Sequence, residues 1–494
     1  RSAPAPHISV RIGDVDITID GDKLAAQFPL HIPREPDFWR AQYREYRRRK
    51  AGRPREEEAP APSPAAKPKP KPASWAALLR PSGAGGAARA ATNGRPAGEG
   101  PGGRQFTSLE DALAHWTVGF NAPAVRPRGL VNTGNMCFMN VVLQALLYCA
   151  PFRSMLGSIK GSVAFSFKAS TPLLEALIQY VHEFKHDKSS AEQLLQLQEA
   201  LEEPFVPENV YAALQEKGAF LTLRGQQEDA QEFMSYLVDG IHEEMALALQ
   251  ARRAPTAAPA PAAEPDAGGW LEVGPDNRGV HMRDAGESAA RTPITQIFGG
   301  ALRSTLTVPQ AGGGRARALH SSTREPFRWL ALDVSAAGVA TVEDALDELV
   351  APESIEGYVN VQGESVHVTK QILLERMPPV LVLHLKRFVF CADAGVQKVH
   401  KFIEYPAVLA LAPNWLARTP EAAQLRRARY TLSGVIYHHG SHASGGHYTC
   451  DILRSADEWL RFDDIDIACL DSVDDVLAEK KDRTAYILFY SIAS

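Results

Sequence analysis

Cys137 is the residue of this sequence best placed for nucleophilic chemistry, because it stands between a turn rich in Gly and Asn and a segment with helical periodicity. In that segment Met139, Val142 and the leucines that follow recur at helical spacing, which predicts an amphipathic helix that begins near Cys137. Unpaired backbone N–H groups at a helix start favour the thiolate, the reactive form of cysteine. Asn132, on the preceding turn, is placed to donate a hydrogen bond to a developing oxyanion.

His447 is the residue best suited to act as a base, and it follows the pair Gly445 and Gly446 at the start of a strand-like run. Glycines let a loop approach another backbone closely, as a narrow substrate channel requires. Downstream, Asp463 and Asp464 end another strand-like run, and from there a carboxylate could orient the imidazole. A cysteine, a histidine and an orienting carboxylate together form the thiol-protease arrangement.

These residues also have simpler interpretations. A buried cysteine is usually a small apolar side chain, and we interpret Cys149, Cys391, Cys450 and Cys469 in this way. The two adjacent aspartates could form a solvated turn. A tract of four histidines, namely His438, His439, His442 and His447, could bind a transition metal. That tract lacks a cysteine partner and matches no established zinc pattern, so we give the metal interpretation less weight.

Two kinds of segment must position these residues. Before about residue 250, apolar residues recur at helical spacing at 139–147, 173–181 and 233–245. Later in the chain, runs rich in β-branched and aromatic residues alternate with polar turns, which predicts strands at 380–388, 430–438, 447–453, 458–462 and 485–490. Helices first and antiparallel strands later predict an α+β domain.

The composition excludes several other classes of protein. The chain has 494 residues and a formal net charge of −5, which argues against general binding to nucleic acid or to anionic membranes. It contains no long apolar run that could span a membrane, and its first residues lack the apolar core of a signal peptide. Its 5 cysteines form no CxxC pair, which favours a reducing compartment. We therefore expect a soluble intracellular protein and, since no initiator Met is present, a fragment.

The chain divides into an N-terminal region, 1–125, and a folded domain, 126–494. Between residues 51 and 104, 33 of 54 residues are Pro, Gly or Ala, so we expect a largely disordered linker. Upstream, alternating apolar and polar residues at 7–22 predict a short β-hairpin. Residues 251–293 are again rich in Ala, Pro and Gly, and we expect them to form a disordered insertion in the domain.

Four blocks of the sequence resemble those of the ubiquitin-specific proteases, cysteine proteases of the peptidase C19 type. GLVNTGNMCFMN (129–140) is similar to the family's Cys box, GGHY (445–448) to its His box, GQQEDAQEFM (225–234) to the helix between them, and LVLHLKRF (381–388) to its next strand. The blocks occur in the family's order over about three quarters of the chain. This resemblance implies a papain-like cysteine protease fold with a helical thumb, a β palm and β fingers.

Within that fold, the resemblance places the thumb at about 127–250, His447 on the palm, and the fingers near 298–332 and 358–377. The fingers of many family members carry two CxxC pairs that bind zinc, and this chain has no CxxC pair. We therefore expect sheet pairing and packing to hold the fingers together, and we expect no metal or other cofactor in folding or catalysis.

Carried over residue by residue, the resemblance implies Cys137 as nucleophile, His447 as base and Asn132 as oxyanion donor. Asp463 is implied as the third catalytic residue because it is the first Asp after Phe462, with Asp464 as the alternative. Contacts with the extended C-terminal tail of ubiquitin are implied for Asp229, Gly445, Gly446 and Tyr448. For Asp229 a simpler role stays open, because Asp is favoured in the first turn of a helix in any case.

The main hypothesis is a thiol-dependent deubiquitinase that hydrolyses the isopeptide or peptide bond after the C-terminal glycine of ubiquitin. Its expected partners are ubiquitin, ubiquitinated proteins and adaptor proteins that dock on the N-terminal region, with no nucleic acid among them. Two rival hypotheses stay open: a ubiquitin-binding scaffold without turnover, and a His/Asp metal hydrolase. We expect a cytoplasmic location, with nuclear access through the basic run at 47–50.

Overall fold

The computed structural model divides the chain into two units, Arg1–Gly94 and Arg95–Ser494. In the first unit, β1 (His7–Ile12) and β2 (Val15–Asp20) pair antiparallel where the sequence predicts a hairpin. The linker expected at 51–104 lies outside the described residues. The structure describes residues 7–12, 15–20, 106, 108–163, 171–187, 189, 202–217, 227–253, 270–273, 279–284, 291–309, 318–359, 365–391, 395–442, 445–455 and 457–493.

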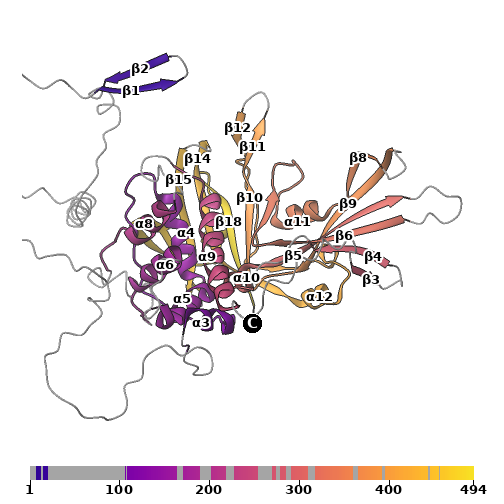
Figure 1. Cartoon of the computed structure of the whole chain (residues 1–494). Helices are drawn as coiled ribbons and strands as arrows, with labels where there is room; N and C mark the ends of the chain where they lie inside the picture. Colours follow the sequence, from indigo (N-terminus) through magenta and orange to yellow (C-terminus); the bar gives the residue numbers. More distant parts are fainter. Residues whose placement is uncertain are drawn as a thin grey trace, which may run out of the picture. The chain divides into compact units, whose positions relative to one another are not determined.

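Helices form one side of the second unit and pack around a shared apolar core (Figure 1). At its centre lies α4 (Cys137–Tyr148), which is buried along its whole length between α5, α9 and strand β15. The apolar residues of 233–245 line the buried face of α9 (Ala230–Arg253), so the three helices predicted from periodicity are confirmed as α4, α6 and α9. The remaining helices on this side are α3 (Leu109–His115), α5 (Ala150–Val163), α6 (Pro172–His182), α8 (Glu208–Glu216) and α10 (Pro293–Phe298).

An eight-stranded sheet carries the other half of the candidate site. Its strand order is β17-β16-β15-β14-β18-β10-β7, and β13 pairs with β14 beside this path. Neighbouring strands are antiparallel except β10 and β7, which are parallel. The strands are β7 (Leu330–Asp333), β10 (Val380–Lys386), β13 (Val408–Ala410), β14 (Arg429–His442), β15 (Gly445–Ser455), β16 (Glu458–Asp463), β17 (Asp466–Leu470) and β18 (Arg483–Ile492).

This sheet is buried on both faces, which explains the unbroken apolar run of β10. Val380 and Val382 point into the core shared with the helices, whereas Leu381 and Leu383 join a second core that includes residues of α11 (Val342–Val350). Successive side chains of a strand alternate between the two faces, so a central strand covered on both sides needs apolar residues at every position. The short elements beyond β10 are η3 (Pro413–Trp415), α12 (Pro420–Ala423), η4 (Gln424–Arg427) and α13 (Val473–Leu477).

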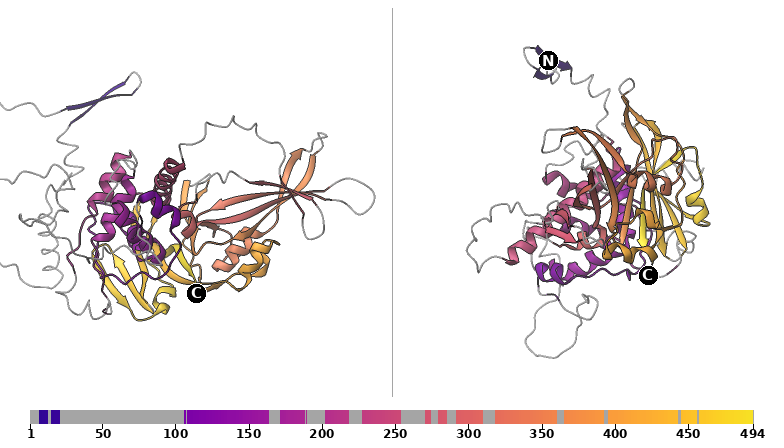
Figure 2. Two further views of the ribbon diagram at one scale, coloured as in Figure 1. Left: turned by 60° about the horizontal axis from the view of Figure 1, so that its bottom comes forward. Right: turned by 90° about the vertical axis from the view of Figure 1, so that its right-hand side faces the viewer.

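A second, six-stranded sheet extends away from the helices (Figure 2), in the order β3-β4-β6-β5-β9-β8. Its longer strands occupy the two ranges where the fingers are expected. A separate ribbon of two antiparallel strands continues from the end of β10. These strands are β3 (Trp270–Val273), β4 (Gly279–Asp284), β5 (Gly300–Pro309), β6 (Ala318–Phe327), β8 (Glu353–Val359) and β9 (Ser365–Arg376), with the ribbon formed by β11 (Phe388–Cys391) and β12 (Gly395–Lys398).

The folded unit differs from the sequence-based boundaries in two places. Helix α3 precedes residue 126, yet Leu109 and Leu113 are buried in the main core, so the folded unit begins earlier than predicted. The range 251–293 was expected to be disordered, but α9 continues to Arg253 and the strands β3 and β4 lie within it. Its other residues up to 290 lie outside the described residues. The prediction overlooked these elements because Ala, Pro and Gly dominate the average composition of the segment.

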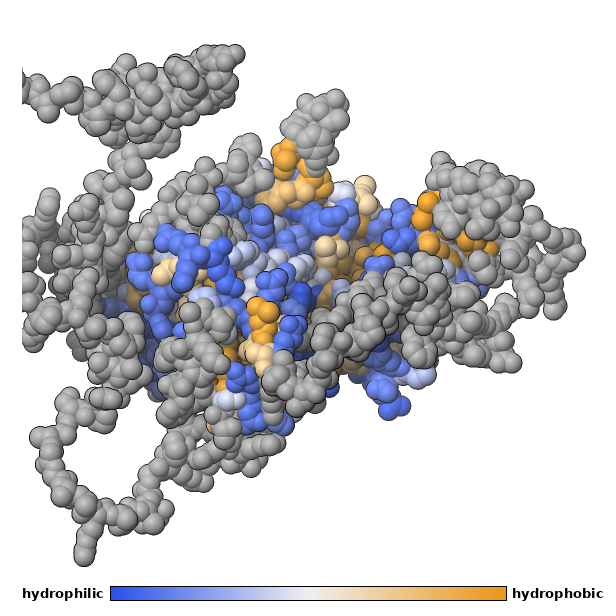
Figure 3. Space-filling view, viewed as in Figure 1, coloured by the Kyte–Doolittle hydropathy of each residue, from blue (hydrophilic) through white to orange (hydrophobic). Residues whose placement is uncertain are grey.

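The described helices give no single segment that is both long and apolar enough to cross a membrane, although α4 and the first part of α5 meet these criteria as a pair bent by 80°. Both members of that pair belong to the main core. The face shown in Figure 3 is largely hydrophilic where the residues are described, with separate groups of apolar residues, one of them on the β11–β12 ribbon.

A buried carboxylate holds the strands β15, β16 and β18 together. Asp451 is fully buried and accepts hydrogen bonds from Arg461 Nε and Nη2, each at 2.7 Å, and from Arg483 Nη1 at 2.9 Å. The guanidinium of Arg483 also stacks on the ring of Tyr437, 4.0 Å from its centroid. Because β15 also carries His447, this network stabilises the strand on which the candidate base lies.

We expect Asp451→Ala to lower the free energy of unfolding by about 3 kcal/mol or more, because it leaves the buried Arg483 guanidinium without its carboxylate. Urea unfolding followed by tryptophan fluorescence would measure the change. The control is Glu479→Ala, which removes an exposed carboxylate and should shift stability by less than about 0.5 kcal/mol. Equal midpoints for the two variants would contradict a stabilising role for this network.

Candidate active site

Cys137 is the first residue of α4, and the turn before it is shaped by Asn132. Asn132 Oδ1 accepts hydrogen bonds from the backbone N–H groups of Gly134 (3.1 Å) and Met136 (2.9 Å). Gly134 and Asn135 have positive φ values of 122° and 55°, conformations that Gly and Asn adopt at low cost. The Gly/Asn-rich sequence is therefore needed to bring the chain sharply into the helix and to place the thiol at its N-terminus.

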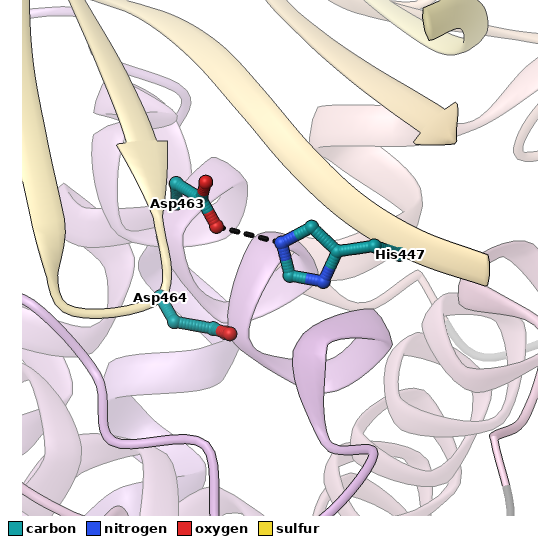
Figure 4. A group of neighbouring side chains, drawn as sticks. All are labelled: His447, Asp463 and Asp464. Atoms are coloured by element: carbon teal, nitrogen blue, oxygen red, sulfur yellow. Dashed lines mark hydrogen bonds and ion pairs between the residues drawn. The ribbon is translucent and has the colours of Figure 1, made fainter. Parts of the chain in front are cut away.

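His447 lies on β15 and faces Asp463 at the end of the neighbouring strand β16 (Figure 4). Its Nε2 is 2.6 Å from Asp463 Oδ1, which leaves Nδ1 for the thiol. The hydrogen bond to Asp463, followed by one to Cys137, raises the pKa of His447 to about 10 against the opposing effect of burial. The structure thus brings the predicted cysteine, histidine and first aspartate into one group, in which the imidazole carries a proton at neutral pH.

Asp464, the neighbour of Asp463, points in a different direction and binds the loop that carries the cysteine. Its Oδ2 accepts from Asn132 Nδ2 at 2.9 Å, and its Oδ1 accepts from Asn140 Nδ2 at 2.8 Å. Its backbone oxygen accepts from Leu130 N at 2.9 Å. Burial raises the pKa of Asp464, while the hydrogen bonds from the two Asn amides act in the opposite direction. Asp464 is therefore placed to position the Cys137 loop, whereas Asp463 contacts the imidazole.

The different directions of the two aspartates follow from the backbone between β16 and β17. Asp463 ends the extended strand β16, whereas Asp464 has a left-handed φ of 52°. Asp and Asn adopt that conformation more readily than most residues. The turn therefore directs the carboxylate of Asp463 toward His447 and that of Asp464 toward the loop that carries Cys137.

The side chains of His447, Asp463 and Asp464 also lie close enough to share a cation, since one ligand atom from each falls within 4.8 Å of the others. The hydrogen bonds around these side chains favour a catalytic group without a metal ion instead. Both oxygens of Asp464 already face amide N–H donors, and Asp463 faces the imidazole. A cation would have to displace these bonds and lie against N–H groups, which disfavours the metal-hydrolase hypothesis.

The glycines before His447 have distinct structural roles. Gly446 has a φ of 155°, and a Cβ added to it would lie 2.2 Å from the backbone oxygen of His439, on the opposite strand. Glycine is thus required there by the β14–β15 hairpin itself. Gly445 has open space around its Cα, so the structure gives no packing reason for glycine at that position. Their proposed contacts with a ubiquitin tail stay predictions.

Asp229 caps α9, as the simpler interpretation of this residue required. Its Oδ1 accepts from the backbone N–H groups of Gln231 (2.7 Å) and Glu232 (3.1 Å), and its Oδ2 accepts from Tyr486 Oη at 2.5 Å. The predicted neighbour Tyr448 is only 1% exposed and packs against the rings of His438 and Tyr486. Tail binding by Asp229 and Tyr448 stays a prediction, and for Tyr448 it would require the buried ring to become accessible.

Sequence reasoning missed Asn140 as part of the site. Asn140 is 2% exposed in the middle of the apolar stretch CFMNVVLQALLY, one helical turn after Cys137. A buried amide N–H needs acceptors, and Asn140 Nδ2 donates to Asp464 Oδ1 and, at 3.5 Å, to the backbone oxygen of Leu130. Polar residues in an otherwise apolar helix, here Asn140 and Gln144, were therefore the available signal.

Comparison with known sequences identifies a family for this chain. The sequence model described as "Ubiquitin carboxyl-terminal hydrolase" matches residues 128–490, which include Cys137, His447 and both aspartates. The chain is 37% identical over 418 residues to the "Probable ubiquitin carboxyl-terminal hydrolase 3" of Schizosaccharomyces pombe, and this alignment covers 78% of each chain.

Other relatives carry the name ubiquitin carboxyl-terminal hydrolase 10. The chain is 35% identical over 425 residues to form 10-B of Xenopus laevis and 34% identical over 408 residues to the protein of Rattus norvegicus. These alignments cover 80% and 77% of this chain but only 51% and 50% of the relatives, so the chain spans about half the length of these hydrolase 10 proteins. The resemblance of the sequence to the ubiquitin-specific proteases therefore includes this subgroup.

The fold is also similar to that of solved structures. The "SAGA Ubp8/Sgf11/Sus1/Sgf73 DUB module bound to ubiquitin aldehyde" aligns with a TM-score of 0.54 and 23% identity, covering 74% of this chain and 70% of that chain. The same module with a single substitution in Ubp8, bound to monoubiquitin, aligns with a TM-score of 0.53 and 22% identity, covering 74% of this chain and 69% of that chain. The α+β fold of the ubiquitin-specific proteases, predicted from the sequence, is thereby confirmed.

We expect Asp464→Asn to lower kcat for hydrolysis of a fluorogenic ubiquitin C-terminal amide about ten- to hundredfold, with a smaller change in KM. A carboxylate accepts hydrogen bonds at two oxygens, but an amide offers only one, so Asn132 or Asn140 would lose its partner. The matched control is Asp457→Asn, an exposed turn residue with nearly the same φ, 58°. Unchanged kcat in Asp464→Asn would show that the loop is positioned without this carboxylate.

Proposed function

The chain belongs to the ubiquitin carboxyl-terminal hydrolase family, and from this premise we propose that Cys137 and His447 hydrolyse the isopeptide or peptide bond after the C-terminal glycine of ubiquitin. The enzyme is a thiol-dependent hydrolase and a deubiquitinase. The observation that carries the proposed residue roles is the 2.6 Å contact between His447 Nε2 and Asp463 Oδ1, beside a cysteine at the start of a helix.

Catalysis begins with attack of the Cys137 thiolate on the carbonyl carbon of the ubiquitin C-terminal glycine. The charged His447, held in orientation by Asp463, donates its Nδ1 proton to the leaving amine, and a thioester to ubiquitin is left. The neutral imidazole then removes a proton from water, which attacks the thioester and releases the ubiquitin carboxylate. The thiolate leaves beside the imidazolium formed in this step, so the starting ion pair is regenerated, and the second proton of the water goes to solvent.

The negative charge on the carbonyl oxygen is stabilised by two N–H groups near the thiol. Asn132 Nδ2 carries two hydrogens and Asp464 accepts one of them, so the other remains for the oxyanion. The backbone N–H of Cys137 lies at the start of α4, where helix N–H groups have no partner in the helix itself. Removing one such donor typically costs about 3 kcal/mol of transition-state stabilisation.

Ubiquitin and further proteins are proposed as binding partners. Ubiquitin is present in the solved complexes with a similar fold, and the acidic start of α9 with Asp229 suits the basic tail of ubiquitin. Adaptor proteins are proposed to dock on the N-terminal region. A cytoplasmic location, with access to the nucleus through the basic run at 47–50, is likewise a proposal from composition and family. The ubiquitin-binding scaffold remains the alternative, and reactivity of Cys137 separates the two.

We expect the chain to form a covalent one-to-one adduct with ubiquitin bearing a thiol-reactive C-terminal warhead, and Cys137→Ala to form none. Intact mass spectrometry measures the adduct, and circular dichroism of both proteins serves as the folding control. An adduct on Cys137→Ala would place the reactive thiol elsewhere. Ubiquitin binding without any adduct on the parent chain would favour the scaffold.

The activity is also expected to depend on pH through the charge of His447. Because the pKa of His447 is raised to about 10, the imidazolium persists well above neutral pH and is lost as the pH rises through that value. We therefore expect kcat/KM for a ubiquitin amide to fall on the alkaline side near pH 10. Asp463→Asn removes the largest cause of the raised pKa, so its alkaline limb should lie at lower pH. An alkaline limb at the same pH in both enzymes would show that Asp463 does not set the charge of His447.

A further inference from the structure

Lys398 is a buried lysine beside β14. This strand pairs with β15, on which His447 lies. Lys398 is the last residue of β12, in the ribbon that continues from β10 (Figure 1). Only 8% of Lys398 is exposed, and its Nζ donates to the backbone oxygens of His438 at 3.0 Å and Gly440 at 2.8 Å. Both acceptors belong to β14, so one side chain joins the ribbon to the eight-stranded sheet.

The two carbonyl groups lie where β14 loses its neighbour on one side. β18 pairs with β14 from Ile492 down to Arg483, which stands opposite His439, and β18 begins there. β14 continues to His442, and its pairing with β15 shifts register between His439 and His442. The Gly440 oxygen therefore lies beyond Arg483, the first residue of β18. The Lys398 ammonium supplies hydrogen bonds at the point where strand pairing ends.

This part of β14 touches the backbone that carries His447. His439 stands directly opposite His447 in the β14–β15 pairing. A Cβ on Gly440, whose φ is 95°, would lie 3.1 Å from Gly446 Cα, and Gly446 is itself close to the His439 oxygen. The contact chain therefore runs from Lys398 through Gly440 to Gly446, the residue before His447.

The charge of Lys398 is balanced by carbonyl dipoles, since no described carboxylate forms an ion pair with it. Burial, followed by the charge of Arg387, lowers the pKa of Lys398 to about 8. The charge of Lys398 in turn disfavours protonation of His438, which is also influenced by His439, His400 and His447. Burying a cation without an anionic partner costs free energy. The two backbone carbonyl groups that accept from Lys398 Nζ offset part of this cost.

We propose that Lys398 is a positioning residue for catalysis, which holds the bulged end of β14 against Gly446 and thereby aligns His447 with Cys137. The same contact makes the placement of the β11–β12 ribbon a determinant of the alignment of the base. This inference rests on the proposed roles of Cys137 and His447. Lys398 acts only through the backbone and does not touch the reacting atoms.

The test compares Lys398→Met, which keeps the length of the side chain but removes its donors, with the parent enzyme. We expect kcat for a fluorogenic ubiquitin amide to fall about tenfold with KM changed less, because a displaced base lowers the rate of the chemical steps. We also expect slower alkylation of Cys137 by iodoacetamide at pH 6, followed by mass spectrometry of the Cys137 peptide, since a displaced imidazolium stabilises the thiolate less. Lys398→Arg, which retains the charge and the donors, should recover part of both rates.

The control is Lys386→Met, which removes the same charge from a half-exposed position on β10 and should leave both rates unchanged. Parent-like kcat and alkylation in Lys398→Met, or losses that only follow the folded fraction in thermal unfolding, would overturn the positioning role. If Lys398→Met is unfolded, Lys398→Gln, which retains an N–H donor, is judged by the same two rates. A parent enzyme that forms no adduct with the ubiquitin warhead would instead refute the proposed function.

Discussion

The turn between β16 and β17 is the constraint on which the geometry of the site depends. The turn directs two successive carboxylates to different partners. Asp463 contacts His447, whereas Asp464 accepts hydrogen bonds from Asn132 and Asn140. The nucleophile and the base come from opposite ends of the domain sequence, and this turn contacts both the base and the loop that carries the nucleophile. A small shift of the turn would therefore change the orientation of the imidazole and the position of the cysteine loop together, which couples two requirements of the reaction in one short segment.

The turn is held by the packing beneath it. α4 packs against β15, and the sheet is covered by a second core on its other face, so neither the helix nor the strand can move without disturbing close-packed side chains. The Asp451 network ties β15 to β16 and β18 at a distance along the strand from His447. Close packing and buried ion pairs together give the rigid support that a preorganised site needs.

Local patterns in the sequence indicate Cys137 and His447 as candidates, because each stands at a boundary between a Gly-rich turn and a regular element, and the family resemblance then implies their roles. The separate placements of Asp463 and Asp464 depend on one backbone angle, the left-handed φ of Asp464, which adjacent identical residues do not reveal. Asn140 and Lys398 act through partners distant in sequence, such as Asp464 and Gly440, so only the assembled fold identifies these partners. Helix α3 was missed because its seven residues follow a long segment of low complexity.

Electrostatics also explains why one histidine among several carries the proton. His438 is fully buried without a hydrogen-bond partner for its ring among the described residues, and burial followed by the charge of Lys398 lowers its pKa to about 3. His439 contacts Thr449 Oγ1 at 2.8 Å, and burial followed by the charge of His447 lowers its pKa as well. In His447, by contrast, the adjacent carboxylate of Asp463 outweighs burial. The histidine tract is therefore differentiated by its neighbours, and Asp463 determines which imidazole can deliver a proton to the leaving amine.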